Sequence, residues 1–473
     1  MVHHPHYRTR RVGLIFTQRA APRVVIDTDT IAAVATPPGR GGIGIVRVSG
    51  SRVAAIATSI TGVLPPARFA QFTTFRDAQA CVIDVGLALY FPAPHSFTGE
   101  HVLELHGHGG PVVMDRLLKR TVELGARLAR PGEFSQRAFL NGKIDLAEAE
   151  AIADLIDSSS EHAARLAVRS LQGEFSRCVR ELLHQLIQLR AYVESAIDFP
   201  DEEIDFLSEG QVGVRLQTVI EQLQSTLNSA RQGCLVREGM TVVIAGQPNA
   251  GKSTLLNLLA GCDLAIVTET PGTTRDVLRA EIDLDGLPLH IVDTAGLRAS
   301  GDPVEQEGMR RAWQQIALAD RILLLIDDRV GYTDTDRALV ERMPATAQLT
   351  LVFNKVDLTG RAAGFSYDNN RPQLALSAKE NQGMDALRQH LKATVGYRGG
   401  NEGAFMARRR HVDALQNAFD VLSHGATQLQ QRNAGELLAE ELRQAQQHLG
   451  TITGEFTSDD LLGEIFASFC IGK

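Results

Sequence analysis

The 473-residue chain has few cysteines, no long apolar run and very little concentrated positive charge. Its five cysteines are scattered without the spacing of metal ligands, so we expect reduced thiols in a cytosolic compartment. They are Cys81, Cys178, Cys234, Cys262 and Cys470. No apolar stretch approaches the roughly 20 residues that a helix needs to span a bilayer, so no membrane span is predicted. The formal net charge of −8 argues against a stand-alone nucleic-acid-binding protein, which would carry a basic footprint.

Acidic side chains are missing from the first 26 residues, which contain several arginines and three early histidines. This composition is similar to that of a transit peptide. A disordered extension, or a start codon assigned too early, fits it better, and residues 1–28 therefore stay outside the fold prediction. In the rest of the chain, the only dense basic cluster is Arg408-Arg409-Arg410. We interpret it as the solvated face of a helix.

Residues 246–254 have the sequence of a phosphate-binding loop, Gly-Gln-Pro-Asn-Ala-Gly-Lys-Ser-Thr. They lie between a β-branched run at 241–244 and a helical apolar stretch at 255–259, which is the strand–loop–helix order that such a loop needs. The two glycines allow backbone N–H groups to turn toward an anion, while Lys252 reaches the β- and γ-phosphates and Ser253 is placed to ligate Mg²⁺. A chance glycine-rich turn is the alternative, and the other motifs of the chain argue strongly against it.

Residues 354–357, Asn-Lys-Val-Asp, follow the apolar strand 351–353 and indicate guanine. The Asp357 carboxylate can accept hydrogen bonds from both the N1–H and the 2-amino group of guanine. Adenine offers no such pair of donors, and a buried carboxylate that is left unpaired costs a few kcal/mol. Residues 377–379, Ser-Ala-Lys, also follow a strand and are placed for a backbone N–H to bind guanine O6.

Residues 293–296, Asp-Thr-Ala-Gly, follow the strand 289–292. They provide an aspartate on the Mg²⁺ side and a glycine N–H that can sense the γ-phosphate. Between them and the phosphate loop, Thr274 lies in a segment suited to a switch loop, which closes when this threonine reaches the metal. Each short motif is weak alone. Four of them in this order, each at the end of a strand, indicate a protein that binds GTP and not ATP.

Leu297 stands just after this motif, where a Ras-like enzyme has a glutamine that orients the attacking water. Leucine cannot do this, so another group must act, or the protein is only a slow switch. The side-chain oxygen of Asn249 can bind a monovalent cation that offsets the same charge as an arginine finger, and the segment 267–273 can supply carbonyl oxygens to it. Glu305 is within reach if the switch region folds back, but its spacing alone favours an ordinary acidic residue in the first turn of a helix.

The segment before residue 143 is mixed, with strands predicted at 31–35, 43–48, 82–91 and 102–106 and a helix at 111–124. Residues 39–44 match the pattern of a dinucleotide-binding loop, but a strand follows them where that site needs a helix, so we reject this interpretation. Residues 106–110, His-Gly-His-Gly-Gly, suggest a metal site. No carboxylate or cysteine is spaced to complete it, and a glycine-rich loop after a strand fits better.

From about residue 145 to 235, apolar residues recur at helical spacing. One long amphipathic helix, ended by Pro200, is predicted from Leu171, Phe175, Cys178, Leu182, Leu186, Leu189, Val193 and Ile197. Alternating strands and helices fill 240–395, with a hairpin at Asp285-Gly286, and the helical pattern then resumes after Gly400. Neither helical block can bury its apolar face alone. We therefore expect the two blocks to pack together, with the nucleotide-binding domain inserted between them.

Three sequences and the inserted G domain together resemble the MnmE (TrmE) family of tRNA-modification GTPases. The sequences are Pro-Pro-Gly-Arg-Gly-Gly-Ile-Gly at 37–44, Arg-Pro-Gly-Glu-Phe-Ser at 130–135 and Phe-Cys-Ile-Gly-Lys at 469–473. The resemblance implies an α/β plus all-α fold, in which a Ras-like P-loop G domain is inserted into a helical domain that follows an α+β folate-binding-type domain. The predicted divisions are an extension (1–28), a tetrahydrofolate-binding domain (29–143), the first half of the helical domain (144–237), the G domain (238–398), and the second helical half with a folate and cysteine tail (399–473).

The resemblance also implies a potassium-activated enzyme whose G domains dimerise across their nucleotide faces. Ser253 and Thr274 stand at the family's Mg²⁺ positions, and its K⁺ positions hold Asn249, Thr268, Thr270 and Thr273. In this family, a glutamate as far past residues 293–296 as Glu305 orients the attacking water. The resemblance therefore makes Glu305 a predicted catalytic residue, although its spacing alone favoured an ordinary residue in a helix. The predicted GTP-binding residues are Asn249, Ala250, Gly251, Lys252, Ser253, Thr254, Thr268, Glu269, Thr270, Pro271, Gly272, Thr273, Thr274, Asp293, Thr294, Ala295, Gly296, Asn354, Lys355, Asp357, Ser377, Ala378 and Lys379.

A one-carbon tetrahydrofolate, bound by the N-terminal domains of the dimer, is a further implication. The family's folate positions are occupied by Arg47, Glu104, Lys143 and Lys473. A carboxylate suits the amino and N–H donors of the pterin, and cations suit the glutamate of folate. Without the resemblance, Arg47 would be an outward-facing strand residue and Lys473 a frayed terminus. The resemblance makes Cys470 a candidate nucleophile, although a buried structural thiol fits equally well because no acid or base flanks it.

Members of this family act with a flavin-dependent partner, MnmG, to install an aminomethyl or carboxymethylaminomethyl group at C5 of the wobble uridine of certain tRNAs. Folate supplies the carbon, and ammonium or glycine the nitrogen. The implied assembly is a cytoplasmic homodimer that forms a heterotetramer with an FAD-binding, MnmG-like partner and acts on tRNA. Two alternatives stay open. A ribosome-assembly GTPase would be a binding switch with an RNA-binding module beside its G domain, and a structural dimer would transduce energy but have a vestigial folate pocket.

Overall fold

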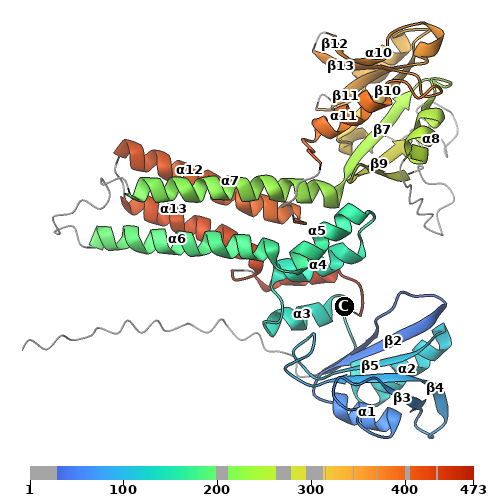
Figure 1. Ribbon diagram of the computed structural model, residues 1–473, viewed down its shortest axis with the longest axis vertical. Coiled ribbons are helices and arrows are strands. Elements are labelled where there is room, and N and C mark those ends of the chain that lie inside the picture. The colour runs from blue at the N-terminus through green and yellow to red at the C-terminus, as the bar shows by residue number, and fades with distance from the viewer. Residues whose placement is uncertain are drawn as a thin grey trace, which may run out of the picture. The chain divides into compact units, whose positions relative to one another are not determined.

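A computed structural model of the chain describes residues 29–198, 211–262, 279–293, 310, 313–314, 316–344, 346–368, 370–399, 405–432, 435–456 and 458–472 (Figure 1). These residues form two compact units, one within Met1–Lys143 and Phe466–Lys473 and the other within Ile144–Ile465. Each unit has its own hydrophobic core. None of the described helices combines the length with the apolar surface that a bilayer crossing requires.

The first unit contains a six-stranded sheet with the order β3-β4-β5-β2-β1-β6. Its strands are β1 (Thr30–Val34), β2 (Gly41–Ser49), β3 (Gln71–Arg76), β4 (Val82–Phe91), β5 (Val102–Gly109) and β6 (Ala126–Leu128). β1 and β6 are parallel, and the other neighbours are antiparallel. Helices α1 (Val53–Thr61) and α2 (Pro111–Glu123) pack against the core on one face. Alternation along β2 places Val46 and Val48 in this core, and therefore Arg47 on the opposite face.

Apolar periodicity predicted only part of this sheet. The predicted strands overlap β1, β2, β4 and β5, and the predicted helix overlaps α2, but α1, β3 and β6 were not predicted. The interpretation of residues 106–110 as a loop was wrong, because β5 runs through to Gly109. Glycine is needed inside this strand, since a Cβ atom at Gly109 would lie 2.6 Å from the backbone oxygen of Ile43.

The C-terminal residues of the chain belong to this first unit. Phe466, near the end of α14 (Asp459–Ala467), packs its ring against Phe139 on α3 (Glu133–Leu140), with ring centroids 6.2 Å apart. Further along, the backbone N–H of Gly132 donates to Cys470 O over 3.3 Å. Gly132 has a φ of +65°, and a Cβ atom there would lie 2.4 Å from Phe466 O. Only glycine permits this close approach.

The second unit combines a helical bundle with a second sheet. The bundle is formed by α6 (Glu174–Asp198), α7 (Gln211–Glu238), α12 (Arg409–Arg432) and α13 (Gly435–Thr453), which lie side by side (Figure 1). One apolar cluster includes fully buried leucines from each of them, for example Leu182, Leu223, Leu415 and Leu442. The prediction that the two helical blocks bury their faces against each other is therefore confirmed.

The start of the long amphipathic helix, predicted to include Leu171, was placed too early in the sequence. Leu171 is the last residue of α5 (Glu161–Leu171), and the bundle helix begins at Glu174. Gly173 between them has a φ of +79°, in the left-handed region where helices end. Apolar spacing continues through this break, so periodicity could not locate it.

The interpretation of residues 408–410 as a solvated face was also wrong. Glu150, on α4 (Leu146–Ile156), has a side chain that is 1% exposed. Its carboxylate accepts a hydrogen bond from Arg410 Nε over 2.8 Å, and Arg408 NH1 lies 3.5 Å from it. Burial alone would raise the pKa of Glu150, but His411 and Arg410 stabilise the ionised form and hold the pKa well below its usual range. Only Arg409 is mostly exposed.

Asp154, one turn further along α4, joins the two tethers of the inserted domain. Its Oδ1 accepts from Arg237 Nε and from Arg408 NH2, each over 2.8 Å. Arg237 lies just before the inserted domain begins, and Arg408 lies just after it ends. One buried carboxylate thus holds both connections. We call the group formed by Glu150, Asp154, Arg237, Arg408 and Arg410 the ionic junction.

The inserted domain has a seven-stranded sheet with the order β12-β13-β11-β10-β7-β9-β8. Its elements are β7 (Met240–Gly246), α8 (Lys252–Cys262), β8 (Arg279–Leu284), β9 (Leu287–Asp293), β10 (Arg321–Asp327), α10 (Asp334–Glu341), β11 (Leu349–Asn354), β12 (Gly364–Asp368), β13 (Arg371–Leu376) and α11 (Met384–Thr394). The five central strands are parallel, and the two edge strands are antiparallel to their neighbours. The hairpin predicted at Asp285-Gly286 is confirmed by the pairing of β8 with β9. Because the central strands are parallel, their carboxyl ends meet at one edge of the sheet.

We expect Glu150→Gln to destabilise the second unit, because it leaves Arg410 without its buried carboxylate partner, although Arg408 keeps Asp154. Breaking a buried ion pair in this way costs about 3–5 kcal/mol. Urea unfolding followed by circular dichroism should show a lower midpoint. Glu440→Gln, which removes the exposed partner of Arg443 on α13, is the matched control and should leave the midpoint unchanged. Equal midpoints for the two variants would contradict the role of the ionic junction.

Candidate nucleotide and folate sites

The loop between β7 and α8 is folded as a cradle for an anion. Gly246 and Gly251 have φ of +139° and +100°, and Asn249 has a φ of 62°, so three positions lie outside the usual region for L-residues. Lys252 Nζ donates to Gly246 O over 2.9 Å and to Gln247 O over 3.0 Å, and therefore lies across the loop. The Asn249 side chain is exposed, as are Ser253 and Thr254 at the start of α8, whereas Ala250 is buried.

Asn354, at the end of β11, connects three of the predicted motifs. Its Nδ2 donates to Ala250 O in the phosphate loop over 2.8 Å. Its Oδ1 accepts from Lys355 N over 2.9 Å and from Ala378 N over 3.0 Å. A Cβ atom at Gly251 would lie 2.2 Å from Asn354 Nδ2, so the second glycine of the loop is required by this contact as well as by its φ.

Asp357, in the short 3₁₀ turn Val356–Leu358, carries a buried acceptor with no partner. Within the described part of the chain, its Oδ1 has no hydrogen bond. Buried polar groups are normally paired, so this atom is available to a donor from a bound molecule. Ser377 and Ala378, which follow β13, are buried, while Lys379 is exposed and lies 3.4 Å from Glu380. The Ser377 hydroxyl accepts from Glu380 N over 3.2 Å, which shapes this turn.

Two supports of the phosphate loop were not foreseen from the sequence. Lys355 Nζ donates to Asn249 O over 2.6 Å and to Asp327 Oδ2 over 2.8 Å. Gln247 Nε2 donates to Thr333 Oγ1 over 2.8 Å and to Asp336 Oδ1 over 3.1 Å. Asp327 ends β10 at the carboxyl edge of the sheet, which was the available signal for it. Asp336 gave no signal, because it belongs to the capping box of α10.

Several predicted residues of this site lie outside the description. The backbone of Asp293 ends β9 at the same edge of the sheet, but its side chain is not described. The following predicted residues, and Leu297, lie outside the described residues: Thr268, Glu269, Thr270, Pro271, Gly272, Thr273, Thr274, Thr294, Ala295, Gly296 and Glu305. Among the residues that are described, no group of three His, Cys, Asp or Glu side chains could hold a metal ion.

Two of the four predicted folate residues meet on the face of the first sheet that α1 and α2 do not cover, which we call its open face. Arg47 NH2 lies 2.9 Å from Glu104 Oε1, and Arg47 NH1 donates to Gly472 O over 3.3 Å. His106 Nε2 is 3.1 Å from Glu104 Oε2. His106 first, then Arg47, stabilise the ionised form of Glu104 and lower its pKa, although burial opposes them. His106 was not predicted as a site residue, although it lies two positions after Glu104 on the same face of β5.

The other predicted folate residues are placed differently. Lys143 Nζ donates to Pro94 O over 3.1 Å, and it is not in contact with Glu104. Phe97, three residues after Pro94, has its ring 5.8 Å from the Arg47 guanidinium carbon. Lys473 lies outside the described residues. Cys470 has an exposed side chain, so the alternative of a buried thiol was wrong.

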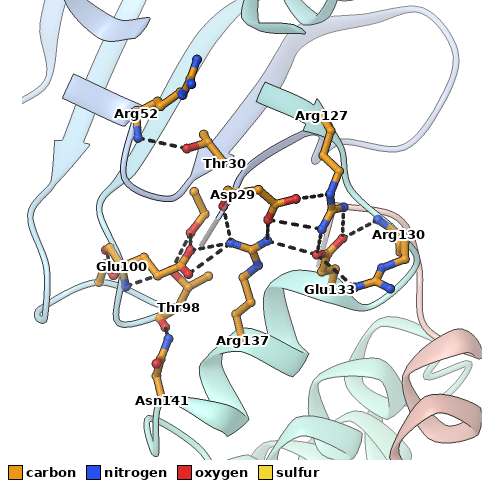
Figure 2. A network of polar contacts seen from close by, with 12 residues as sticks. Asp29, Thr30, Arg52, Thr98, Glu100, Arg127, Arg130, Glu133, Arg137 and Asn141 are labelled. Atoms are coloured by element: carbon orange, nitrogen blue, oxygen red, sulfur yellow. Dashed lines mark hydrogen bonds and ion pairs between the residues drawn. The ribbon is translucent and has the colours of Figure 1, made fainter. Parts of the chain in front are cut away.

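A buried ionic network links the start of α3 to Glu100 and Asp29 (Figure 2). Glu133, at the start of α3, is 2% exposed and accepts from Arg127 NH2 over 2.6 Å and from Arg137 NH2 over 3.1 Å. Burial opposes ionisation, but these arginines lower the pKa of Glu133 to about 2. Arg137 also donates to Glu100 over 3.1 Å. The network therefore fixes α3, which carries the Phe134 ring beside Arg47, to the turn that precedes β5.

Two consecutive segments of the chain match models of one family. Residues 30–143 match the GTP-binding protein TrmE N-terminus, and residues 146–470 match the MnmE helical domain. The tRNA modification GTPase MnmE of Hydrogenovibrio crunogenus is 59% identical over 445 residues, which are 94% of this chain and 99% of that protein. The tRNA modification GTPase MnmE of Proteus mirabilis is 57% identical over 451 residues, again 94% of this chain and 99% of that protein.

Among solved structures, a crystal structure of Era from Aquifex aeolicus covers 38% of this chain and 66% of its own, with 23% identity and a TM-score of 0.27. The two relatives described above are tRNA modification GTPases and extend over nearly the whole chain. The ribosome-assembly switch considered above is thereby set aside. On its sequence, the chain belongs to the MnmE (TrmE) family of tRNA modification GTPases and is a GTP hydrolase.

Proposed function

We propose that the carboxyl edge of the second sheet binds and hydrolyses GTP, and that the open face of the first sheet binds a one-carbon tetrahydrofolate used to modify C5 of a tRNA wobble uridine. The single observation that carries the nucleotide assignment is Asn354. Its side chain is 2% exposed and joins the phosphate loop, the 354–357 motif and the 377–379 motif through three hydrogen bonds. A buried amide in this position makes the phosphate and base regions one rigid site.

Guanine would be read by Asp357 and by the backbone around Ala378. The unpartnered Asp357 Oδ1 suits the N1–H or the 2-amino group of the base. Lys252 would leave its two loop carbonyls and turn to the β- and γ-phosphates, because a phosphate is a stronger acceptor than a peptide carbonyl. In this proposal the remaining GTP contacts come from the predicted residues at 249–254, 268–274 and 293–296.

Two cations complete the proposed GTP site. Mg²⁺ would be held by Ser253 and Thr274, and K⁺ by Asn249 with Thr268, Thr270 and Thr273. Together the ions would supply positive charge beside the transferred phosphoryl group. The exposed Asn249 side chain, held on a left-handed turn of the phosphate loop, supports the K⁺ assignment. Glu305 is the proposed residue that orients the attacking water, since Leu297 cannot.

The folate proposal rests on the charge pattern around Arg47. The ionised Glu104 suits the amino and N–H donors of a pterin, and Arg47, Lys143 and Lys473 suit the carboxylates of the folate glutamate. Phe97, which lies beside Arg47 and is 36% exposed, would offer apolar surface to the ring. Tetrahydrofolate would supply the one-carbon unit, and the chain would bind and orient it.

The proposed assembly is a cytoplasmic homodimer that acts on tRNA with an FAD-containing, MnmG-like partner in a heterotetramer. An acidic chain fits this arrangement, because the partner can provide most of the tRNA contact. Cys470 is proposed as a nucleophile, supported by its exposed side chain and by its place two residues before Gly472, which Arg47 contacts. The domain boundaries after residues 28, 143, 237 and 398 also stay a prediction.

Asp357→Asn should lower the affinity for GTP by about 100-fold, because it removes a charged acceptor worth about 1.5–3 kcal/mol per hydrogen bond. The same change should improve binding of xanthosine triphosphate, whose 2-oxo group accepts a hydrogen bond from the new amide. Displacement of a fluorescent GDP analogue measures both affinities. Asp385→Asn, at an exposed position in α11, is the control. Unchanged discrimination between the two nucleotides would contradict the guanine assignment.

Replacing K⁺ by Na⁺ should lower GTP turnover by about 100-fold, because the proposed K⁺ supplies the positive charge that an arginine finger supplies in other GTPases. The K⁺-dependent rate should also rise with protein concentration, because the proposed G domains dimerise. Asn249→Ala should remove most of the K⁺ response, while Asn257→Ala, at an exposed position of α8, should retain it. Comparable turnover in both salts, without dependence on concentration, would overturn this mechanism.

Glu104→Gln should weaken binding of a stable formyl-tetrahydrofolate by about tenfold, because hydrogen bonds to a charged acceptor are worth about 1.5–3 kcal/mol. Equilibrium dialysis of the full chain measures this affinity. Asp115→Asn, on α2 and hence on the other side of the sheet, is the matched control and should bind as the wild type does. If both variants bound folate equally well, the open face of the sheet would not be the site.

A further inference from the structure

The Asn249 turn is held from outside the phosphate loop. A non-glycine residue with a φ of 62° is uncommon, and the conformation persists only where surrounding contacts enforce it. Asn249 is flanked by Pro248 and Ala250, and its own carbonyl is bound by Lys355, which lies outside the loop. The contacts that enforce the conformation come from the segment between β10 and α10 and from Lys355.

On one side of the turn, a chain of two charged contacts begins at Asp327. Asp327 Oδ2 accepts from Lys355 Nζ over 2.8 Å, and the same Nζ donates to Asn249 O over 2.6 Å. Asp327 has a side chain that is 14% exposed, and its outer partner is Arg329. The Arg329 and Lys355 hydrogen bonds hold the pKa of Asp327 well below its usual range, so the carboxylate stays ionised at neutral pH.

On the other side, the capping box of α10 reaches the loop through Gln247. Asp336, which is 2% exposed, accepts from Thr333 N and from Gln247 Nε2. Thr333 Oγ1 accepts from the same Gln247 amide over 2.8 Å. Gln247 and Asn249 lie on either side of Pro248. Gln247 donates directly to Asp336, and Asn249 is linked to Asp327 through Lys355.

We propose that Asp327, acting through Lys355, and Asp336, acting through Gln247, are positioning residues for the cation site at Asn249. The inference rests on the proposed K⁺ site. The direction of the Asn249 side chain follows from its backbone conformation, and the two aspartates fix that conformation from opposite ends of one connecting segment. A cation bound by protein oxygens depends on the placement of those oxygens, so loosening the turn weakens the cation before it weakens the base contacts.

The test measures the K⁺ concentration that gives half-maximal GTP turnover, alongside the KM for GTP at saturating K⁺. Asp327→Asn and Asp336→Asn should each raise the half-maximal K⁺ concentration about tenfold, the loss expected for one charge-assisted hydrogen bond. The KM for GTP should change less than twofold. Asp327→Glu, which keeps the charge, should restore part of the K⁺ response.

Matched variants separate this role from general loss of structure. Arg329→Gln removes the outer partner of Asp327 but leaves the contact with Lys355, and Asp334→Asn changes an exposed carboxylate in the first turn of α10. Both should keep the wild-type response to K⁺. Gln247→Ala combined with Asp336→Asn should be no worse than either change alone, because the two residues form one path.

A K⁺-activated wild type with an unchanged half-maximal K⁺ concentration in the two aspartate variants would overturn the positioning role and leave the K⁺ site standing. A rise in the KM for GTP equal to the rise in the half-maximal K⁺ concentration would also overturn it, since the aspartates would then support the whole nucleotide site. A wild type with no K⁺ activation would overturn the proposed cation site and this inference together.

Discussion

The second unit depends on the neutralisation of two buried carboxylates, Glu150 and Asp154. Their arginine partners come from both sides of the inserted domain, and Arg410 also donates to the last carbonyls of α13 at Thr451 and Ile452. A buried charge is costly unless every partner is present. Only a fold that brings the two helical blocks and both tethers to α4 satisfies these groups. The ionic junction thus selects one topology for a bundle whose helices are interrupted by a whole domain.

At the carboxyl edge of the second sheet, buried polar groups from distant parts of the chain again hold the structure in one arrangement. Parallel strands deliver short motifs to one edge of the sheet, but the strands alone do not fix how the connecting loops lie. Asn354 holds the loop at Ala250, Lys355 holds it at Asn249, and Asp336 holds it at Gln247. A phosphate loop built from left-handed turns is therefore kept in shape by buried polar groups that arrive from later in the chain. Preorganisation of this kind lets binding energy go to the nucleotide.

Much of the fold and the base-reading motifs could be predicted from the sequence, because they depend on local periodicity and on fixed spacings. The hairpin at Asp285 and the packing of the helical blocks are of this kind. The sequence could not reveal the break at Gly173, since apolar spacing runs through it, or the burial of Arg408 and Arg410, whose partners are more than 250 positions away. Asp327, Asp336 and His106 were also missed. Asp327 and Asp336 act through residues that are distant in sequence, whereas His106 contacts Glu104 on its own strand and could have been found from the alternation of β5.

The C-terminal tail carries a constraint on length. Phe466 and Phe469 are anchored against α3 and its preceding turn, the Cys470 carbonyl is bound by Gly132, and the Gly472 carbonyl is bound by Arg47. A Cβ atom at Gly472, where φ is +97°, would lie 2.6 Å from Val34 O. The length of the chain between Phe469 and Gly472 is therefore fixed by the contacts at its two ends. An insertion or deletion of a single residue there would break the alignment of Cys470 with Arg47, whereas most substitutions at the exposed Ile471 would not, so natural variation in this segment should change side chains and preserve spacing.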